Sequence, residues 1–532
     1  MNKNGNILLI ALLGIVIGVL LSVTAGKFYS SNRKFDGDYN RWRKLNLILE
    51  QVQSNYVDTI DMKKMTDAAV VAALSELDPH SVYLPPVDLE ESETELAGNF
   101  DGIGIQFNVP NDTAIVLSVI QGGPSEKAGL MQGDRIIRVG DDVIAGTKTP
   151  QDSMVRLMKG PSGTKVKITV NRDGSEIPFE ITRGKIPVKC VDAAFMVNDT
   201  TGYIRLSKFT RTTYQEFAQA GEKLLSHGMT RLIFDIRGNT GGYFDQSFLL
   251  CNEFLPKNAS IVYMQGLHRP RQDFNADGRG ELKDIGLLVL IDESSASSSE
   301  IFAGAMQDND RGVIIGRRSF GKGLVQEPIN FTDGSGIRLT VARFYTPSGR
   351  CIQKPYSDGT KYAYDIYERY RHGEMTDADS IHVDSSEVYY TVKGRPVYGG
   401  GGIVPDIFVP MDTTRATDFY IKCNRKATQM RFASEMFDRY KSTLSKIDDF
   451  DELSRYLDGL HLDRLFLDFA RDTDGLVPGK GEWKETADYM MPQIRALVGR
   501  YSKLDDEAFY RFYLDIDETV QVALGLEEGE IY

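Results

Sequence analysis

Residues 287–306 have the sequence Leu-Leu-Val-Leu-Ile-Asp-Glu-Ser-Ser-Ala-Ser-Ser-Ser-Glu-Ile-Phe-Ala-Gly-Ala-Met. The apolar run at 287–291 predicts a buried strand, and the run at 301–306 predicts a helix. The serine cluster between them therefore lies on a strand-to-helix turn. There a hydroxyl can be exposed, and the first N–H groups of the helix can stabilise an oxyanion. Serines also cap helices, and capping is the structural alternative for any one of them.

A second element, Ser-Phe-Gly-Lys-Gly at 319–323, follows a predicted buried strand at 313–315. Its lysine, Lys322, becomes a general base only where burial lowers its pKa toward neutrality, because the ammonium form has no lone pair. A neutral lysine beside a serine hydroxyl can accept its proton and activate it for acyl transfer. Gln326 lies four residues further on, and we expect it to orient the amine from an extended loop.

Two other motifs indicate ligand sites that the surrounding sequence argues against. Residues 316–322 fit the phosphate-loop pattern GxxxxGK, but Gly323 stands where such a loop needs Ser or Thr, and Pro328 follows instead of a helix. Residues 273–278 match the opening of a calcium loop, but Asp284 occupies the twelfth position, where Glu is usual. We therefore expect a solvated turn there, and no metal or cofactor.

Glycines and apolar residues alternate at 100–105, in Phe-Asp-Gly-Ile-Gly-Ile. Such a loop can point backbone N–H groups at a carboxylate while the adjoining strand edge pairs with an extended peptide. With the later stretches 122–130 and 133–137, it resembles PDZ domains. The resemblance implies that a substrate C-terminus binds at Gly102, Ile103, Gly104 and Ile105. A small β domain with a purely structural role is the alternative.

Residues 40–410 resemble the carboxyl-terminal processing peptidases, or tail-specific proteases. That family carries Ser-Ala-Ser-Ala-Ser-Glu and Phe-Gly-Lys-Gly-x-Val-Gln stretches, which correspond here to 295–300, where Ser298 replaces the usual alanine, and to 320–326. The resemblance implies a Ser297–Lys322 dyad supported by Gln326. It also makes Glu300 an accessory residue and gives the Ser298 N–H a part in the oxyanion hole.

A third family element is Asp-Ile-Arg-Gly-Asn-Thr-Gly-Gly at 235–242. The resemblance implies that its backbone N–H groups complete the oxyanion hole, with Gly241 and Gly242 as the candidates. Thr240 stands where the family often has proline. A glycine-rich turn with only a structural role is the alternative. Further matches lie at 56–58, 77–81, 202–204 and 402–406.

The N-terminus differs in composition from the rest of the chain. Residues 7–25 are uncharged and almost wholly apolar, and at about 1.5 Å per residue they match the hydrocarbon core of a bilayer. A single-pass anchor is the prediction, a removable signal peptide the main rival, and a buried core helix the third alternative. The first two export the remainder, so we expect the cell inner membrane with extracytoplasmic catalytic domains.

These features predict a multi-domain, mixed α/β chain, which 532 residues are enough to form. The expected segments are the anchor or signal (1–30), a helical segment (35–95), a PDZ domain (96–185), a protease core (186–411) and a helical extension (412–532). The resemblance implies a crotonase- and Clp-like fold for the core. The last segment lies outside the resemblance.

The predicted function is that of a serine endopeptidase selecting exported proteins by their C-terminal tails. The expected partners are unfolded or tail-exposed proteins, and the organisation leaves room for a regulatory adaptor and for homo-oligomers. The net charge of −13 argues against nucleic acid. A catalytically silent PDZ adaptor is the rival from another class. A Ser–His–Asp hydrolase is disfavoured, since the sequence has no GxSxG elbow.

Overall fold

The computed structural model describes residues 37–110, 112–357, 359–383, 386–527 and 529, which divide into two units between Ala73 and Leu74. Helices α2 (Gly37–Asn55) and α3 (Met62–Ser75) are the elements of the first unit, α3 crossing the division. The predicted anchor or signal segment lies outside the described residues. Within the described ranges, no helix combines the length and apolar character needed to span a bilayer.

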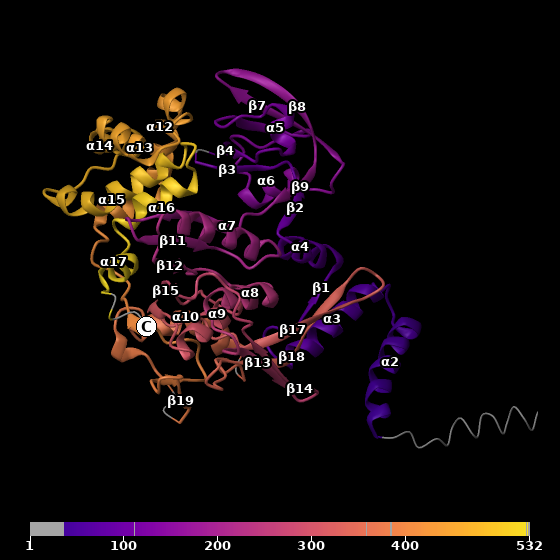
Figure 1. The fold of residues 1–532 in the computed structure, drawn as a ribbon. Coiled ribbons are helices and arrows are strands. Elements are labelled where there is room, and N and C mark those ends of the chain that lie inside the picture. The colour runs from indigo at the N-terminus through magenta and orange to yellow at the C-terminus, as the bar shows by residue number, and fades with distance from the viewer. Residues whose placement is uncertain (1–36, 111, 358, 384–385, 528, 530–532) are drawn as a thin grey trace, which may run out of the picture. The chain divides into compact units, whose positions relative to one another are not determined.

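A six-stranded sheet forms the centre of the larger unit (Figure 1). Its strands lie in the order β10 (Val191–Met196), β11 (Thr201–Leu206), β12 (Arg231–Asp235), β15 (Gly286–Ile291), β16 (Val313–Gly316) and β21 (Ile407–Phe408). The β10–β11 pair is antiparallel, and the other neighbours are parallel. Strands buried on both faces need continuous apolar runs, which explains the composition of β15.

Side chains on the two faces of this sheet belong to different cores. On one face, Leu232, Phe234 and Val289 pack with residues of α7 (Thr213–Ser226), α8 (Phe244–Phe254) and α9 (Ser298–Asp308). On the other face, Ile233, Leu288 and Leu290 pack with residues from the C-terminal helices. The sheet is thus the middle of three layers.

A second sheet has the order β1 (Val82–Leu84), β18 (Gly336–Tyr345), β13 (Ser260–Gly266) and β14 (Arg269–Asn275), with β17 (Leu324–Asn330) also paired to β18. Strand β1 corrects the expectation that 35–95 is helical throughout. Residues 82–84 pair antiparallel with β18. They can do so because Pro79 prevents the helix from continuing and β18 has an edge free to pair. Helix α4 (Pro86–Leu96) follows.

The small β domain is built around strands β3 (Ile105–Asn108), β4 (Ala114–Val119), β5 (Arg135–Val139), β7 (Lys165–Arg172) and β8 (Ser175–Thr182), in that order in the sheet. Strand β6 (Asp142–Val143) pairs with β5, and β2 (Asn99–Gly102) with β9 (Gly184–Pro187). Helices α5 (Pro124–Ala128) and α6 (Gln151–Met158) accompany them. The domain has its own apolar core, which includes Ile136, Ile168 and Met154.

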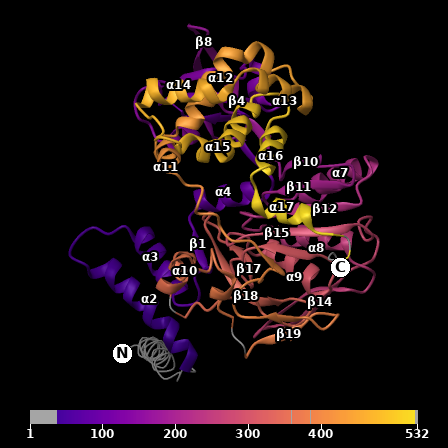
Figure 2. The same ribbon diagram turned by 90° about the vertical axis from the view of Figure 1, so that its left-hand side faces the viewer.

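After β16 the chain also forms α10 (Gly359–Arg371), the 3₁₀ turn η1 (Ala378–Ser380), and the pair β19 (Val388–Tyr390) and β20 (Pro396–Tyr398). The C-terminal region is helical, as predicted. It contains α11 (Asp418–Arg425), α12 (Thr428–Leu444), α13 (Phe450–Gly459), α14 (Leu462–Asp474), α15 (Glu482–Gly499), α16 (Asp506–Leu514) and α17 (Glu518–Gly525). Figure 2 shows α17 alongside β12 and β15.

Candidate active site

The predicted site residues lie on three turns at one edge of the six-stranded sheet. The turns follow β12, β15 and β16, which are adjacent and parallel, so their carboxyl ends meet at the same edge. This edge is where open parallel sheets bind their ligands. The fold therefore brings the glycine turn, the serine turn and the lysine loop together, although 87 residues separate Asp235 from Lys322 in the sequence.

Ser297 is the last residue before α9, and its backbone has φ 56° and ψ −113°. A non-glycine residue in this region costs about 1–3 kcal/mol, and such strain clusters at functional sites. Within 295–300 Ser297 alone is half-exposed, whereas the other five residues are buried. The conformation thus leaves Ser297, alone in this stretch, partly accessible to solvent.

The neighbouring serines have structural partners. Ser295 Oγ donates to the carbonyl of Ile236 at 2.9 Å, and Ser299 Oγ to that of Asn239 at 2.8 Å. Ser298 Oγ donates to the carbonyl of Gly242 at 3.0 Å. Among the described residues, the Ser297 hydroxyl donates to no such carbonyl. The other serines are thus tied to neighbouring turns, whereas Ser297 is the N-cap residue of α9 and shares a capping box with Glu300.

The carboxylate of Glu300 joins the serine turn to the lysine loop. Its Oε2 accepts the backbone N–H groups of Ser297 at 2.9 Å and Lys322 at 2.8 Å. Its Oε1 accepts the Gly321 N–H at 2.7 Å and the Ser319 hydroxyl at 2.5 Å. All four partners are donors, so they favour the ionised carboxylate.

Glu300 is fully buried. Burial raises its pKa, and the hydrogen bonds from Ser319, Lys322, Gly321 and Ser297 oppose that rise. The four donors compensate in part for the lost hydration of the carboxylate. Glu300 therefore fixes the relative position of the two backbone segments that carry Ser297 and Lys322.

Burial is the main cause that lowers the pKa of Lys322, and the positive charge of Arg338 adds to it. The carboxylates of Glu300 and Asp78 act in the opposite direction. The Lys322 Nζ donates to Gln326 Oε1 at 3.2 Å. A lysine with this combination of burial and a neutral hydrogen-bond acceptor is suited to lose its proton.

The sequence predicts Gln326 in an extended loop, whereas the structure places it in strand β17. The β17–β18 register shifts between Val325, opposite Ala342, and Gln326, opposite Thr340, so the extra residue at this irregularity, Val341, lies in β18. Bulges re-aim side chains and are frequent beside active sites. The Gln326 Nε2 donates in turn to the backbone carbonyl of His80, which fixes the amide orientation.

A tight turn at 78–81 holds that carbonyl. Asp78 accepts the N–H groups of His80 at 2.8 Å and Ser81 at 2.9 Å, and the Ser81 hydroxyl at 2.6 Å. The His80 ring meets the Tyr362 hydroxyl at 2.6 Å. Burial, assisted by the charge of Lys322, lowers the pKa of His80 to about 4, so its ring is neutral at pH 7.

The glycine turn packs directly against the serine turn. Gly241 has φ 97°, and a Cβ placed on it would lie 2.8 Å from Ser297 Cβ and 2.9 Å from Ser298 N. Only glycine permits this approach. Its own N–H donates to Asn239 Oδ1 at 2.9 Å. The N–H groups of Gly242 and Ser298 have no acceptor among the described residues.

The predicted peptide-binding loop lies between β2 and β3. Gly104 has φ 76°, and the Ile103 side chain is buried in the core of the small domain. Neither the Ile103 nor the Gly104 N–H is donated to another described residue. Strand β3, which starts at Ile105, is at the edge of its sheet. Gly102 ends β2.

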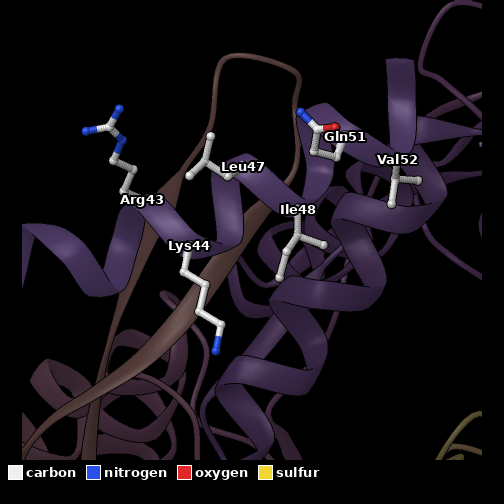
Figure 3. A pocket seen from close by; sticks show the side chains of 6 residues that line it. All are labelled: Arg43, Lys44, Leu47, Ile48, Gln51 and Val52. Atoms are coloured by element: carbon white, nitrogen blue, oxygen red, sulfur yellow. The ribbon is translucent and has the colours of Figure 1, made fainter. Parts of the chain in front are cut away.

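A solvent-open hollow elsewhere contains none of these residues. Six side chains of α2 line it, and Leu47 and Ile48 are 45% and 50% exposed (Figure 3). Its lining consists of Arg43, Lys44, Leu47, Ile48, Gln51 and Val52.

Sequence reasoning missed several residues that build the site. The sequence singles out Asp78 and His80 only as members of the matching stretch 77–81. It assigns Ser319 and Asn239 no part in the site. Asp292 was also missed: its Oδ1 accepts the N–H groups of Gly238 at 2.9 Å and Ser294 at 3.0 Å. A signal was available for Ser319, which directly precedes the Phe-Gly-Lys-Gly stretch.

Comparisons with known proteins agree with the arrangement of these motifs. The model of peptidase family S41 matches residues 200–365, and that of the PDZ domain matches residues 102–182. The carboxy-terminal-processing protease of Bartonella bacilliformis is 34% identical over 347 residues, which are 64% of this chain and 78% of the relative. The carboxy-terminal processing protease CtpA of Bacillus subtilis is 32% identical over 317 residues, which are 59% of this chain and 67% of the relative.

Among solved structures, the photosystem II D1 C-terminal processing protease is similar at 29% identity, with a TM-score of 0.35. The match covers 58% of this chain and 84% of that one. The matched models and relatives define a serine-type peptidase with a PDZ domain. The chain belongs to the carboxy-terminal processing proteases of peptidase family S41.

Proposed function

We propose that the chain is an endopeptidase in which Ser297 is the nucleophile and Lys322 the general base. The observation that carries the proposal is the Glu300 carboxylate, which accepts the backbone N–H groups of both residues through one oxygen. The partial exposure of Ser297 and the lowered pKa of Lys322 support these roles. Gln326, held by the His80 carbonyl, orients the amine.

In the first step Lys322 Nζ takes the proton of the Ser297 hydroxyl, and Oγ attacks the scissile carbonyl carbon. The lysine then gives that proton to the leaving amine as the peptide C–N bond breaks. The acyl group stays on Ser297 Oγ as an ester, the acyl-enzyme. Water attacks the ester by the same route, with Lys322 again the base. Each step needs Lys322 to alternate between neutral and charged forms, which its lowered pKa favours.

We assign the oxyanion hole to the N–H groups of Ser298 and Gly242. Both lack an acceptor among the described residues, and the Ser298 hydroxyl donates to the Gly242 carbonyl. Gly241 contributes by close approach, because its own N–H is already donated to Asn239. A donor of this kind contributes about 10²–10³ to kcat.

The loop at 102–105 would capture the substrate's terminal carboxylate, and the edge of β3 would pair with the preceding residues. The unused N–H groups of Ile103 and Gly104 support this role. The solved PDZ domain of a Vibrio cholerae carboxy-terminal protease, in complex with a peptide, is 36% identical over 17% of this chain and 99% of that one, with a TM-score of 0.16.

The substrates in this proposal are exported proteins with unstructured C-terminal tails. The apolar run at 7–25 would anchor the chain in the inner membrane with its catalytic region outside the cytoplasm. A crotonase- and Clp-like topology of the core belongs to the same proposal, as do assembly into homo-oligomers and a regulatory adaptor.

The test uses a fragment from residue 37 and an unfolded protein with an apolar C-terminal tail. Wild type, Ser297→Ala and Lys322→Ala are compared, and a substrate with an amidated C-terminus serves as control for tail capture. We expect cleavage by wild type alone, and slower cleavage of the amidated substrate. Tail binding without cleavage by wild type would favour the silent adaptor, and cleavage by Ser297→Ala would refute the dyad.

A further inference from the structure

The C-terminal extension forms one layer of the protease core. Helices α16 and α17 cover the face of the six-stranded sheet opposite α9. Leu514, Val520 and Ala523 are buried there with Leu288 and Leu290 of β15. Figure 2 shows α17 beside the strands that lead into the glycine and serine turns. The extension is therefore close to the back of the candidate site.

One polar contact crosses from this layer to the glycine turn. Asp517 caps α17, and its Oδ1 accepts the Val520 N–H at 3.2 Å. Its carboxylate also accepts two hydrogen bonds from the guanidinium of Arg237, at 3.0 and 2.6 Å. The Asp517 side chain is only 9% exposed. The pair is bidentate and largely excluded from water, which makes it strong and geometrically specific.

Arg237 belongs to the turn that carries Gly241 and Gly242. The same guanidinium donates to Asp235 at 3.0 and 2.6 Å, and the Arg237 N–H donates to Asp235 Oδ1 at 3.0 Å. Asp235 is also held by Arg205 at 2.6 Å. Asp235 thus pairs with two cations, Arg205 and Arg237. Arg237 in turn is held by two carboxylates, those of Asp235 and Asp517.

The remainder of this turn is bonded to the serine turn. The Gly238 N–H donates to Asp292 at 2.9 Å, and the Ala296 N–H donates to the Asn239 carbonyl at 3.0 Å. A shift at Arg237 would therefore move the glycine turn relative to Ser297. Catalytic donors lose effect steeply when they are displaced by a fraction of an ångström.

We infer that Asp517 of the C-terminal extension is a positioning residue for the oxyanion hole, acting through Arg237. The inference rests on the proposed function and goes beyond it, because Asp517 lies outside residues 200–365, which match the peptidase family. Asp517 touches neither the substrate nor Lys322. It stabilises the arrangement in which the Gly242 and Ser298 donors face the developing oxyanion.

The experiment uses the full chain in detergent, with Asp517→Asn, Asp517→Ser and Asp517→Glu. Asn and Ser can both still accept the Val520 N–H as helix caps, but neither offers Arg237 two carboxylate oxygens, so we expect the fold to be retained and the bidentate pair to be lost. Active sites are counted with a fluorophosphonate, and kcat is expressed per titrated site. Asp438→Asn is the matched control, since Asp438 in α12 pairs with Arg135 at the other end of the extension.

We expect Asp517→Asn and Asp517→Ser to lower kcat about 10-fold with KM unchanged. A peptide aldehyde, whose hemiacetal uses the same hole, should bind about 10-fold more weakly. The acid limb of the pH profile should not move, because the surroundings of Lys322 are unchanged. Asp517→Glu should recover most of the activity, and Asp438→Asn should match wild type.

Equal kcat per titrated site in wild type and Asp517→Asn would overturn the inference. So would a loss of titratable sites with an unchanged aldehyde affinity, because that result indicates a purely structural role. These outcomes leave the proposed function intact. A wild-type chain that cleaves no better than Ser297→Ala would instead overturn the proposed function, and the inference with it.

Discussion

The pH dependence of cleavage tests whether Lys322 acts as a neutral base. Gln326→Glu places a negative charge where the neutral acceptor Oε1 now lies, 3.2 Å from Lys322 Nζ. With an effective dielectric constant of about 40 to 80, Coulomb's law gives about 1.3–2.6 kcal/mol of stabilisation for the ammonium form. At about 1.4 kcal/mol per pKa unit, the pKa of Lys322 should rise by about 1–2 units.

The sign of the effect follows from the role of the lysine. The active form is neutral, so a higher pKa moves the acid limb of kcat/KM toward higher pH. The plateau should also fall about 10-fold, because a carboxylate cannot donate to the His80 carbonyl as Nε2 does. Cleavage of a fluorescently quenched, unfolded substrate between pH 5 and 10 measures both quantities.

Gln272→Glu is the matched control, since it adds the same charge at an exposed position on β14. Its acid limb should coincide with that of wild type. An acid limb of Gln326→Glu that stays in place, or moves to lower pH, would refute the assignment of Lys322 as the base. If the plateau also fell while the acid limb stayed in place, that loss would mean that Gln326 orients a group other than the base.

Three further predictions concern the surroundings of the dyad. Gly241→Ala should lower kcat more than 100-fold in steady-state kinetics, because the new Cβ would lie 2.8 Å from Ser297 Cβ. The control is Gly140→Ala, where φ is 62° and the new Cβ meets open space, so kcat should not fall. A wild-type kcat in Gly241→Ala would contradict the packing of the two turns. Glu300→Gln should destabilise the protein by about 3 kcal/mol in urea unfolding, since an NH2 group in place of Oε2 loses the two charge-assisted hydrogen bonds from the Ser297 and Lys322 N–H groups at about 1.5 kcal/mol each; an unchanged midpoint would count against the carboxylate. His80 has a pKa of about 4 in the folded chain and about 6.5 unfolded, so the free energy of unfolding should fall by about 2 kcal/mol, after screening, as the pH drops from about 6.5 to 4. Urea unfolding of His80→Gln should show a smaller dependence of that free energy on pH. The same pH dependence in wild type and His80→Gln would refute the shift.

The sequence alone determined the local parts of the site. The apolar run at 287–291, the serines after it and the helix at 301–306 predict a strand, a turn and a helix, because these signals depend on near neighbours. The same holds for the loop at 102–105 and the glycines at 241–242. Resemblance in the order of motifs added the roles proposed for Ser297 and Lys322.

Tertiary structure decided which distant groups meet these parts. The contact of Gln326 with the His80 carbonyl joins residues 246 positions apart, and the register shift beside Gln326 arises only when β17 pairs with β18. Glu300 accepts four donors because the turns after β15 and β16 converge at one sheet edge. Periodicity carries no information on such partners.

The role of the C-terminal extension is the clearest case of this division. The strand at 287–291 is apolar at every position, which requires burial on both faces but does not say what covers them. The folded chain covers one face with α9 and the other with α16 and α17. Only that packing brings Asp517 to Arg237, since a long-range ion pair depends on the path of the whole chain.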